Sequence, residues 1–548
     1  MSEAHHLPGI FDIPPATIRS NHLYYGDNLT IMRSMPSACI DLTYLDPPFN
    51  SQRNYNLIYQ KLTGQPVPEQ EEAFCDAWDM DPEKEEMARR MPIVLREYGV
   101  DEDLVLFWKA WIDALRHTQP RLLAYLIYMS YRLLEMRRIL KPTGSLYLHC
   151  DPNASHYIKV IMDGIFGHQN FMNEITWERF NFHADAHRWG RLHDVLLHYV
   201  KDAKHYTFRP QRRDYDEGYI RSHFKQDAEG RLYRLDNAVA KGQGPARTFF
   251  GKLLEPPKGT HWRWSQENID RLSAEGRIVL TSNGRPTVIR YLDEMPGHAI
   301  GDVWTDIPEI NSQAKERLGY PTQKPIALLM RIIEASSNPG DVVFDPFAGC
   351  GTTIYAAHLT GRKWIGCDIA ILSVQLVRDV LLKRYGLKEG EHYQISGVPR
   401  SLEAAQVLFE SDPRQFQHWA VELAGGFSST KHSGDLGIDG RIHFETKDGL
   451  RNMVLSVKGG KLTPAFMREL RGVVERESAT EMGGMICLQE PTKGMRAEAA
   501  NAGIYAFLGK EYHQLQIRTI QELLEGKAFD TPSRVQTLNW TKQTVMAL

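Results

Sequence analysis

DVVFDPFAGCGTTIYAAHLTGRKWIGCDI, residues 341–369, has the pattern of a strand, a tight turn, a helix and a second strand. The first strand ends at Asp345, and Gly349 and Gly351 let the backbone of the turn approach a ligand closely. The amide groups that open the following helix are directed at the same turn. The second strand ends at Asp368, where a doubly wound sheet places a carboxylate that binds ribose hydroxyls. The stretch predicts an α/β fold whose turn can bind a nucleotide-like cofactor.

A second strand ending, DLTYLDPPFNSQRNY at residues 41–55, has unusual chemistry. Alternating apolar residues lead to Asp46, which two prolines and an aromatic residue follow. Pro47 and Pro48 cannot donate to a sheet ladder, so they end the strand and stiffen the chain after it. The sequence therefore predicts a fixed arrangement of the Asp46 carboxylate, the Pro47 carbonyl and the ring of Phe49.

Strands and helices alternate through most of the chain, which predicts a doubly wound, parallel sheet with both faces covered. A helical pattern over 101–140 is interrupted at Pro120, and apolar periodicity weakens between about residues 173 and 310. We expect one large domain at 1–386, an inserted region at 173–310, a linker at 387–401 and a smaller α/β domain at 402–548.

Composition limits the class of protein. The 548 residues carry a net charge of -3, and their six cysteines include no CxxC pair. This cysteine usage is typical of a reducing compartment and indicates neither a disulfide framework nor a zinc site. Because no signal peptide or membrane-spanning stretch is apparent, we expect a cytoplasmic protein with no membrane partner.

The two strand endings together carry a family resemblance. DPPF at 46–49 and DPFAGCGT at 345–352 resemble the catalytic and cofactor signatures of the amino-group DNA methyltransferases that use S-adenosylmethionine. The catalytic signature comes first, as in the circularly permuted beta group of that family. Further matches are YYGDN at 24–28, RLLEMRRILKPTGSLYLHCDP at 132–152 and YPTQKP at 320–325.

The resemblance implies methyl transfer to the exocyclic amine of adenine in double-stranded DNA, in a restriction-modification or phage-defence setting. Asp46 and the carbonyl of Pro47 would accept the amine hydrogens, Phe49 would stack on the flipped base, and Pro48 would keep the pocket rigid. Methylation of the cytosine amine or of a protein glutamine are the alternative activities. A nucleic-acid-binding protein without catalysis is the alternative from another class.

Cofactor residues are also implied by the resemblance. Phe347 would pack near the adenine of S-adenosylmethionine, Asp368 would bind the ribose, and Asp27 would reach the adenine. Gly349 and Gly351 would line the methionine side. The remaining expected cofactor residues are Asp345, Thr352, Thr322 and Lys324, the last two near the methionine carboxylate together with Gln323. Asp151 either borders the pocket or caps the helix that follows it.

Positive charge concentrates in the inserted region. Residues 201–263 hold 14 Lys and Arg against 8 Asp and Glu, with aromatic residues between them. Such a stretch is either a solvated face or a surface that neutralises DNA phosphates, and the resemblance places target recognition here. Arg209, Arg212 and Arg213 are the expected DNA contacts.

The C-terminal domain resembles the Mrr-type branch of restriction-endonuclease-like folds. The resemblance implies that Asp439 binds Mg²⁺ and that Lys458 assists an attacking water. Ser456 and Gln417 stand where the family commonly has stronger metal ligands or a glutamate. We therefore expect either slow, metal-dependent cleavage or a DNA-holding role without cleavage. The oligomeric state is left open, with a homodimer as one option.

Overall fold

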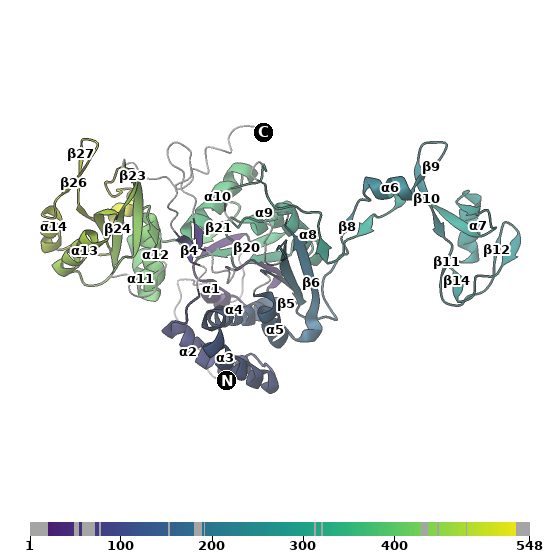
Figure 1. The fold of residues 1–548 in the computed structure, drawn as a ribbon, viewed down its shortest axis with the longest axis horizontal. Coiled ribbons are helices and arrows are strands. Elements are labelled where there is room, and N and C mark those ends of the chain that lie inside the picture. The colour runs from purple at the N-terminus through teal and green to yellow at the C-terminus, as the bar shows by residue number, and fades with distance from the viewer. Residues whose placement is uncertain are drawn as a thin grey trace. The chain divides into compact units, whose positions relative to one another are not determined.

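The computed structural model describes residues 20–48, 54–56, 72–75, 78–151, 154–179, 189–190, 192–311, 314–318, 320, 322–428, 437–446, 449–477 and 479–532 (Figure 1). The chain forms two compact units, of which one is residues 210–301 and the other combines the segments before and after it. No helix among the described residues is long and apolar enough to cross a membrane.

The larger unit is built on a nine-stranded sheet in the order β18-β6-β7-β5-β2-β19-β20-β1-β21. Neighbouring strands are parallel except at β7, which runs antiparallel to both β5 and β6. The expectation of a purely parallel sheet is wrong: the sheet is mixed. The strands are β1 (His22–Tyr25), β2 (Ile40–Leu45), β5 (Leu140–Cys150), β6 (Phe171–Glu178), β7 (His193–Val200), β18 (Val303–Trp304), β19 (Val342–Asp345), β20 (Lys363–Asp368) and β21 (Gln394–Ser396).

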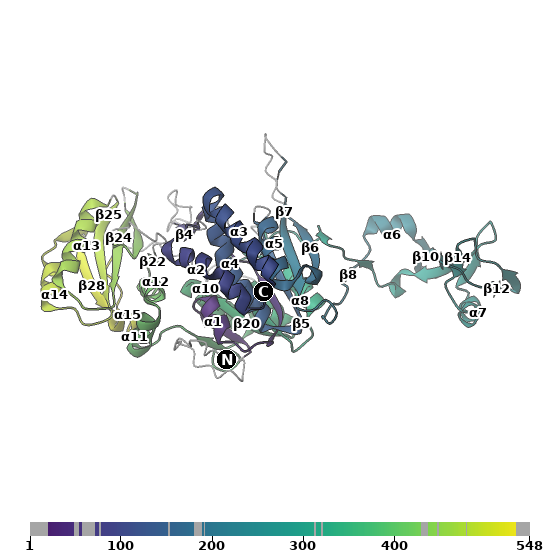
Figure 2. The same ribbon diagram turned by 90° about the horizontal axis from the view of Figure 1, so that it is seen from below.

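Helices cover both faces of this sheet, as the alternating pattern predicts. In Figure 1, α8 to α10 lie on one side of it and α1 to α5 on the other, and Figure 2 shows the second group from below. The helices are α1 (Asn28–Ser34), α2 (Pro82–Glu97), α3 (Glu102–Thr118), α4 (Pro120–Ile139), α5 (Ser155–Phe166), α8 (Ile326–Ser336), α9 (Thr352–Leu359) and α10 (Ile371–Tyr385). Pro120 is the first residue of α4, so the predicted interruption is confirmed.

The central strands are buried on both faces, although β2 also contains the polar residues Asp41 and Thr43. Every residue of β2 is buried, and so is every residue of β19 from Val343 onward. Burial along the whole strand is typical of strands that helices cover on both sides. β19 lies between β2 and β20 although it comes late in the chain, so residues 40–45 and 342–345 become neighbours.

The smaller unit, residues 210–301, has its own core around Ala238, Phe249, Trp262 and Ile269. It is narrower than the inserted region expected at 173–310, because β6 and β7 are strands of the large sheet. Its elements are β8 (Arg212–Arg213), α6 (Glu217–His223), β9 (Lys225–Gln226), β10 (Leu232–Asn237), β11 (Val239–Lys241), β12 (Arg247–Phe249), β13 (Lys252–Leu254), β14 (Thr260–Trp262), α7 (Gln266–Ala274), β15 (Ile278–Leu280), β16 (Pro286–Tyr291) and β17 (His298–Ala299).

The C-terminal part of the larger unit contains a five-stranded sheet in the order β22-β23-β24-β25-β28. The expected linker at 387–401 includes β21, which pairs with β1 at the edge of the large sheet. The elements are α11 (Leu402–Ser411), α12 (Pro413–Leu423), β22 (Phe427–Ser428), β23 (Gly440–Thr446), β24 (Gly449–Lys458), α13 (Pro464–Arg476), β25 (Thr480–Cys487), α14 (Lys493–Ala500), β26 (Ile504–Phe507), β27 (Lys510–His513), β28 (Leu515–Thr519) and α15 (Ile520–Leu524). A short hairpin of β3 (Asn54–Asn56) and β4 (Glu72–Cys75) completes the described strands.

Candidate active site

Three acidic residues stand at the carboxyl ends of adjacent parallel strands. Asp46 follows β2, Asp345 ends β19 and Asp368 ends β20. Parallel strands present their carboxyl ends at one edge of the sheet, which is where doubly wound folds bind ligands. The structure thus brings together two signatures that lie about 300 residues apart in the chain.

Asp46 is held by a lysine from the YPTQKP stretch. Lys324 Nζ donates to Asp46 Oδ2 at 2.5 Å and to the Thr322 carbonyl at 3.3 Å. The side chains of Asp46 and Lys324 are only 16% and 11% exposed, so the ion pair is largely shielded from water. Lys324 therefore contacts the expected catalytic carboxylate, whereas the sequence resemblance placed it at the cofactor. Asp46 Oδ1 makes no hydrogen bond to any residue that the structure describes.

A buried polar chain underlies this strand ending. The hydroxyl of Tyr44 lies 3.0 Å from His149 Nδ1, and His149 Nε2 lies 3.1 Å from Asp194 Oδ2. Burial opposes ionisation of Asp194, but the hydrogen bond and charge of His149, with the charge of Arg179, hold its pKa well below the usual value. These residues come from β2, β5, β7 and the end of β6, so no local sequence signal could have joined them.

The glycine turn after β19 is closed around Asp368. The amides of Gly349 and Ala370 donate to the two carboxylate oxygens of Asp368 at 2.8 and 2.9 Å. Burial is the main cause that raises the pKa of Asp368 to about 6. Gly351 has a φ of 84°, and a Cβ there would lie 2.7 Å from Cγ2 of Val377. The turn therefore has no room for a side chain at this position.

Asp345 is deeply buried, at 3% exposed. Its Oδ1 accepts the amide of Phe347 at 3.0 Å, so it shapes the start of the glycine turn. Burial raises the pKa of Asp345 to about 7, and the negative charges of Asp46 and Asp368 add to the effect. The three carboxyl groups are thus electrostatically coupled.

Asp27 is engaged by an arginine that sequence reasoning did not single out. Arg132 donates to Asp27 Oδ2 at 2.5 Å and to Asn28 Oδ1 at 2.6 Å, and its guanidinium lies over the ring of Tyr128. Asp27 also caps α1 by accepting the amide of Thr30. Burial opposes ionisation, yet Arg132 keeps the pKa of Asp27 below its usual value.

The other expected residues have simpler surroundings. Thr352 is the buried first residue of α9, and Pro47 and Pro48 follow β2 as expected. Asp151 accepts the amide of Ala154 at 3.1 Å, but the N-cap of α5 is Ala154 and no side chain caps that helix, so Asp151 is not its N-cap. Phe49 lies outside the described residues.

A C-terminal helix reaches the segment directly after Asp368. Glu422 of α12 accepts the amide of Ile371 at 3.1 Å, and Gln415 donates to the carbonyl of Ile369 at 3.2 Å. Burial raises the pKa of Glu422 to about 8. This contact spans about 50 residues and could not be read from the sequence.

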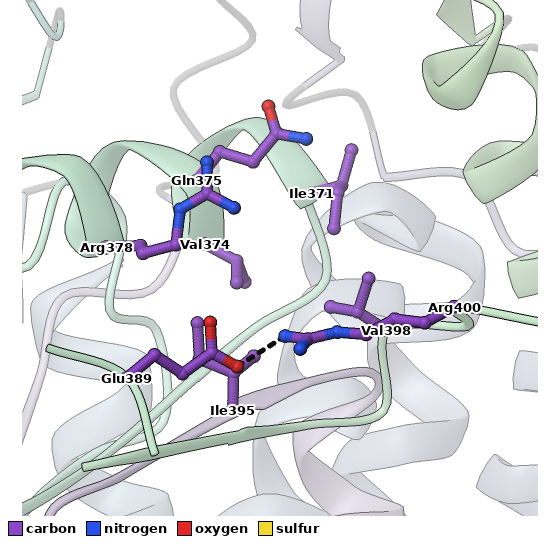
Figure 3. A pocket seen from close by; sticks show the side chains of 8 residues that line it. All are labelled: Ile371, Val374, Gln375, Arg378, Glu389, Ile395, Val398 and Arg400. Carbon is purple, nitrogen blue, oxygen red and sulfur yellow. Dashed lines mark hydrogen bonds and ion pairs between the residues drawn. The ribbon is translucent and has the colours of Figure 1, made fainter. Parts of the chain in front are cut away.

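A pocket of about 240 Å³ lies along the first turns of α10 (Figure 3). Val374 and Arg378 line it from the helix, and Glu389 and Arg400 form an ion pair on the opposite side. None of the residues expected to bind the cofactor or the base lines this pocket.

The three arginines expected at DNA have different environments. Arg209 belongs to the larger unit, where it donates to the Ser337 carbonyl and to the Asn338 side chain. Arg212 and Arg213 are exposed on β8 of the smaller unit, and Arg212 donates to the Gly297 carbonyl. Arg209 is therefore partly committed to holding the chain near the end of α8.

In the C-terminal domain, Asp439 lies next to the backbone of the residues that precede Lys458. Asp439 Oδ2 accepts the amide of Val457 at 2.6 Å and lies 3.4 Å from the Ser456 hydroxyl. The ammonium of Lys458 lies 5.0 Å from the ring centre of Phe466. In the part of the chain that the structure describes, no three His, Cys, Asp or Glu residues are grouped to hold a metal. These residues do not fit the Mg²⁺ site that the resemblance implies.

Two family models match the chain. The DNA methylase model matches residues 40–378, and the model of NACHT-associated inactive Restriction Endonuclease 1 matches residues 413–525.

Curated relatives agree with the first match. The chain is 34% identical over 265 residues to the Type II methyltransferase M.EcaI of Enterobacter cloacae, covering 48% of this chain and 58% of that protein. It is 25% identical over 418 residues to the StyLTI Mod subunit, a Type III restriction-modification enzyme of Salmonella typhimurium, covering 72% and 59%. It is 25% identical over 348 residues to the DNA adenine methyltransferase YhdJ of Escherichia coli, covering 63% and 78%. The chain thus spans less than two thirds of the first two relatives.

Solved structures give weaker alignments. A DNA modification methylase of Thermus thermophilus, in complex with S-adenosyl-L-methionine, aligns at 15% identity over 69% of this chain and 99% of that chain, with a TM-score of 0.32. The cytosine-N4-specific PvuII DNA methyltransferase aligns at 12% identity over 74% and 96%, with a TM-score of 0.33. These scores are too low to add to the family match.

Proposed function

Because this chain belongs to the DNA methylase family, we propose that it transfers a methyl group from S-adenosylmethionine to the exocyclic amine of adenine in double-stranded DNA. One observation carries the proposal. Asp46, with a free carboxylate oxygen among the described residues, directly follows a strand that pairs with the strand of the glycine turn. An acceptor for an amine therefore lies beside a turn suited to a nucleotide-like cofactor.

The residues around Asp46 are suited to activate the weakly nucleophilic amine of adenine. The adenine amine is a weak nucleophile because its lone pair is conjugated with the ring. Asp46 Oδ1 and the carbonyl of Pro47 would accept its hydrogens and favour a pyramidal nitrogen with an available lone pair. Lys324, bonded to the other oxygen of Asp46, fixes the orientation of the carboxylate before the base arrives.

The described residues fit S-adenosylmethionine, which supplies an electrophilic methyl group. Gly349 and Gly351 have φ values of 50° and 84°, which residues with a side chain rarely adopt. Without side chains, the backbone of the turn after β19 can also approach a ligand closely. Asp368 lies at the end of the next strand, positioned to accept ribose hydroxyls with the lone pairs that its two amide contacts leave. We further propose that Phe347 and Asp27 border the adenine side.

We also propose that the domain is circularly permuted, as in the beta group of amino-group methyltransferases. The sheet order supports this: the cofactor turn follows a central strand, β19, that comes after β2, β5, β6 and β7 in the chain. In this proposal, the compact unit of residues 210–301 is the target-recognition region, since the wider range of 173–310 includes β6 and β7 of the large sheet.

For the C-terminal domain we propose a DNA-holding role without cleavage, in a restriction-modification or phage-defence setting. One carboxylate oxygen of Asp439 accepts the amide of Val457, and the hydroxyl of Ser456 lies beside the same oxygen. A hard divalent ion needs several oxygen ligands, and the described residues contain no group of three His, Cys, Asp or Glu that could supply them. The match to a family of inactive restriction endonucleases supports the same conclusion.

Mapping of modified bases tests the main proposal. Unmethylated genomic DNA is incubated with S-adenosylmethionine and either the wild-type protein or Asp46→Ala, and then sequenced by a method that reads base modification. We expect N6-methyladenine at one short sequence with the wild type and none with the variant. N4-methylcytosine instead would move the substrate to cytosine, and an unmodified DNA would overturn the proposed activity.

A further inference from the structure

The smaller unit distributes its charges unevenly. Residues 210–301 contain 15 Lys and Arg and 12 Asp and Glu. Many of its carboxylates are taken up by arginines from α6, α7, β10, β16 and neighbouring turns. The pairs are Arg221 with Glu217, Arg231 with Asp293, Arg234 and Arg290 with Asp236, Arg271 with Glu275, and Arg277 with Glu294.

Nine cations of the unit have no such ion pair among the described residues: Arg212, Arg213, Lys225, Arg285 and five that lie together in one stretch. Residues 241–263 run from the end of β11 through the hairpin β12–β13 to the residue after β14, and they include five cations and one acidic residue, Glu255. No ion pair joins any of the five to a residue that the structure describes. Four of them are exposed and Arg247 is half-buried. The five are Lys241, Arg247, Lys252, Lys258 and Arg263.

The hairpin β12–β13 adds exposed apolar side chains to these charges. Phe249 is buried and packs against Trp262 with ring centres 4.8 Å apart, which anchors the hairpin on the small core. Phe250, at the tip, is 53% exposed, and Leu253 is 72% exposed. Large exposed apolar groups beside unpaired cations are typical of a binding surface rather than of a solvated face.

The backbone at the tip gives an independent reason to expect a function. Phe249 pairs with Lys252, so Phe250 and Gly251 form a two-residue loop, with φ values of 48° and 76°. A loop with both values positive favours Asn-Gly, and a bulky residue such as Phe is rare there. The chain thus keeps an aromatic ring at the tip at a cost in backbone strain, which is typical of functional sites.

We propose that the hairpin β12–β13 is the DNA-contacting element of the smaller unit, with Phe250 as an apolar wedge against the bases. The cations of residues 241–263 would neutralise phosphates, and the ring of Phe250 would pack on the bases in the groove or between base steps. This inference rests on the proposed function, because it takes double-stranded DNA as the partner. It moves the main DNA contact from Arg209, Arg212 and Arg213 to the hairpin.

Matched pairs of substitutions test the charges. Lys252→Gln with Lys258→Gln removes two unpaired cations, whereas Arg221→Gln with Arg271→Gln removes two that are already paired on α6 and α7. Both double variants change the net charge equally. Binding of a fluorescent, mixed-sequence duplex is measured over a range of salt concentrations. We expect the hairpin pair to weaken binding on the order of tenfold and to reduce the salt slope by about two, with little change for the control pair.

Phe250→Asn tests the wedge. Asn suits the positive φ of Phe250, so the melting temperature should stay the same or rise, while DNA affinity falls several-fold. Leu280→Thr, which alters an exposed residue at the end of β15, is the matched control and should leave DNA affinity unchanged. A stable Phe250→Asn protein with wild-type affinity would overturn the wedge.

Three further readouts separate this inference from the proposed function. Cofactor binding by calorimetry should be the same in all variants. If the wild type binds DNA through the hairpin but modifies no base, the inference stands and the proposed activity fails. The inference fails if the protein methylates DNA and the Lys252→Gln, Lys258→Gln variant binds DNA like the control double variant. It also fails if the hairpin substitutions change self-association in sedimentation instead of DNA affinity.

Discussion

Asp46 is the side chain on which the proposed chemistry depends most directly. It lies at the end of a fully buried strand, and its only hydrogen bond among the described residues is to Lys324 through Oδ2. A carboxylate held on one side and open on the other is suited to accept a proton from a substrate amine. It needs no contact with the cofactor for this role.

Asp46→Asn should therefore lower turnover far more than cofactor affinity. The amide keeps the size of the side chain but loses the charge that stabilises the developing positive nitrogen, so we expect at least about a hundredfold loss in single-turnover methylation. Calorimetry should show nearly unchanged binding of S-adenosylmethionine. Parallel loss of binding and activity would assign Asp46 to the cofactor site.

Lys324→Met distinguishes between the two positions considered for this lysine. The sequence resemblance places Lys324 at the methionine carboxylate, whereas the structure pairs it with Asp46. If it orients Asp46, the variant should reduce kcat roughly tenfold and leave cofactor affinity within about twofold. A large fall in cofactor affinity with normal kcat at saturation would return Lys324 to the cofactor side.

Asp345 gives a prediction about stability and pH. Its pKa rises from the usual 3.8 to about 7 in the folded protein, so folding opposes its ionisation. The free energy of unfolding should therefore fall as the pH rises from about 4 to about 7 and level off above that.

Asp345→Asn keeps an acceptor for the Phe347 amide and removes this penalty. In urea denaturation we expect the variant to gain up to about 4 kcal/mol relative to wild type at pH 8, and less at pH 5. An equal difference at both pH values would contradict this.

Among the elements, the glycine turn between β19 and α9 is the one that positions most of the site. Its amides bind the carboxylates of Asp345 and Asp368, so its shape is linked to the charges around it. The two glycines are not equivalent. A Cβ on Gly351 would lie 2.7 Å from Val377, whereas one on Gly349 would lie 3.4 Å from the ring of Tyr320.

Gly351→Ala should consequently be the more damaging of two matched substitutions. It combines a positive φ with a close contact, and we expect a loss of about 1–3 kcal/mol in the free energy of unfolding together with weaker cofactor binding. Gly349→Ala should lose less stability. Thermal melts and calorimetry on both variants check this, and a reversed order would show that the turn rearranges when the cofactor binds.

The strands and the turn could be predicted because their signals are local. Apolar runs that end in Asp-Pro and a glycine-bearing turn mark β2, β19 and α9 within a few residues each. The direction of β7 could not be predicted, because nothing in residues 193–200 indicates whether that strand runs parallel or antiparallel to its neighbours. The same limit applies to side chains: Lys324 and Asp46 are 278 positions apart, and no local pattern joins them.

For the molecule as a whole, the contact between the C-terminal helix α12 and the segment that follows β20 matters most. Gln415 and Glu422 both bind backbone groups of residues 369–371, which directly follow Asp368. The C-terminal domain therefore helps to fix the loop beside the expected ribose carboxylate. The contact links the domain proposed to hold DNA with the cofactor end of the sheet.

The protonation of Glu422 should control how firmly this contact is closed. Burial raises its pKa from the usual 4.5 to about 8. Glu422 therefore holds a proton when α12 is packed against residues 369–371, and it releases that proton when the contact opens to solvent. Closure should weaken by up to about tenfold per pH unit between pH 5 and pH 8, and change little above pH 8. Glu422→Gln keeps an acceptor for the Ile371 amide without ionising, so the pH dependence due to this group should vanish while that of Asp368 remains.

Hydrogen exchange at the Ile371 amide, corrected for intrinsic rates, measures closure directly. Equal slopes in wild type and Glu422→Gln would show that Glu422 does not control the contact, whereas a steeper slope in the wild type would make the C-terminal domain a pH-sensitive support of the cofactor loop.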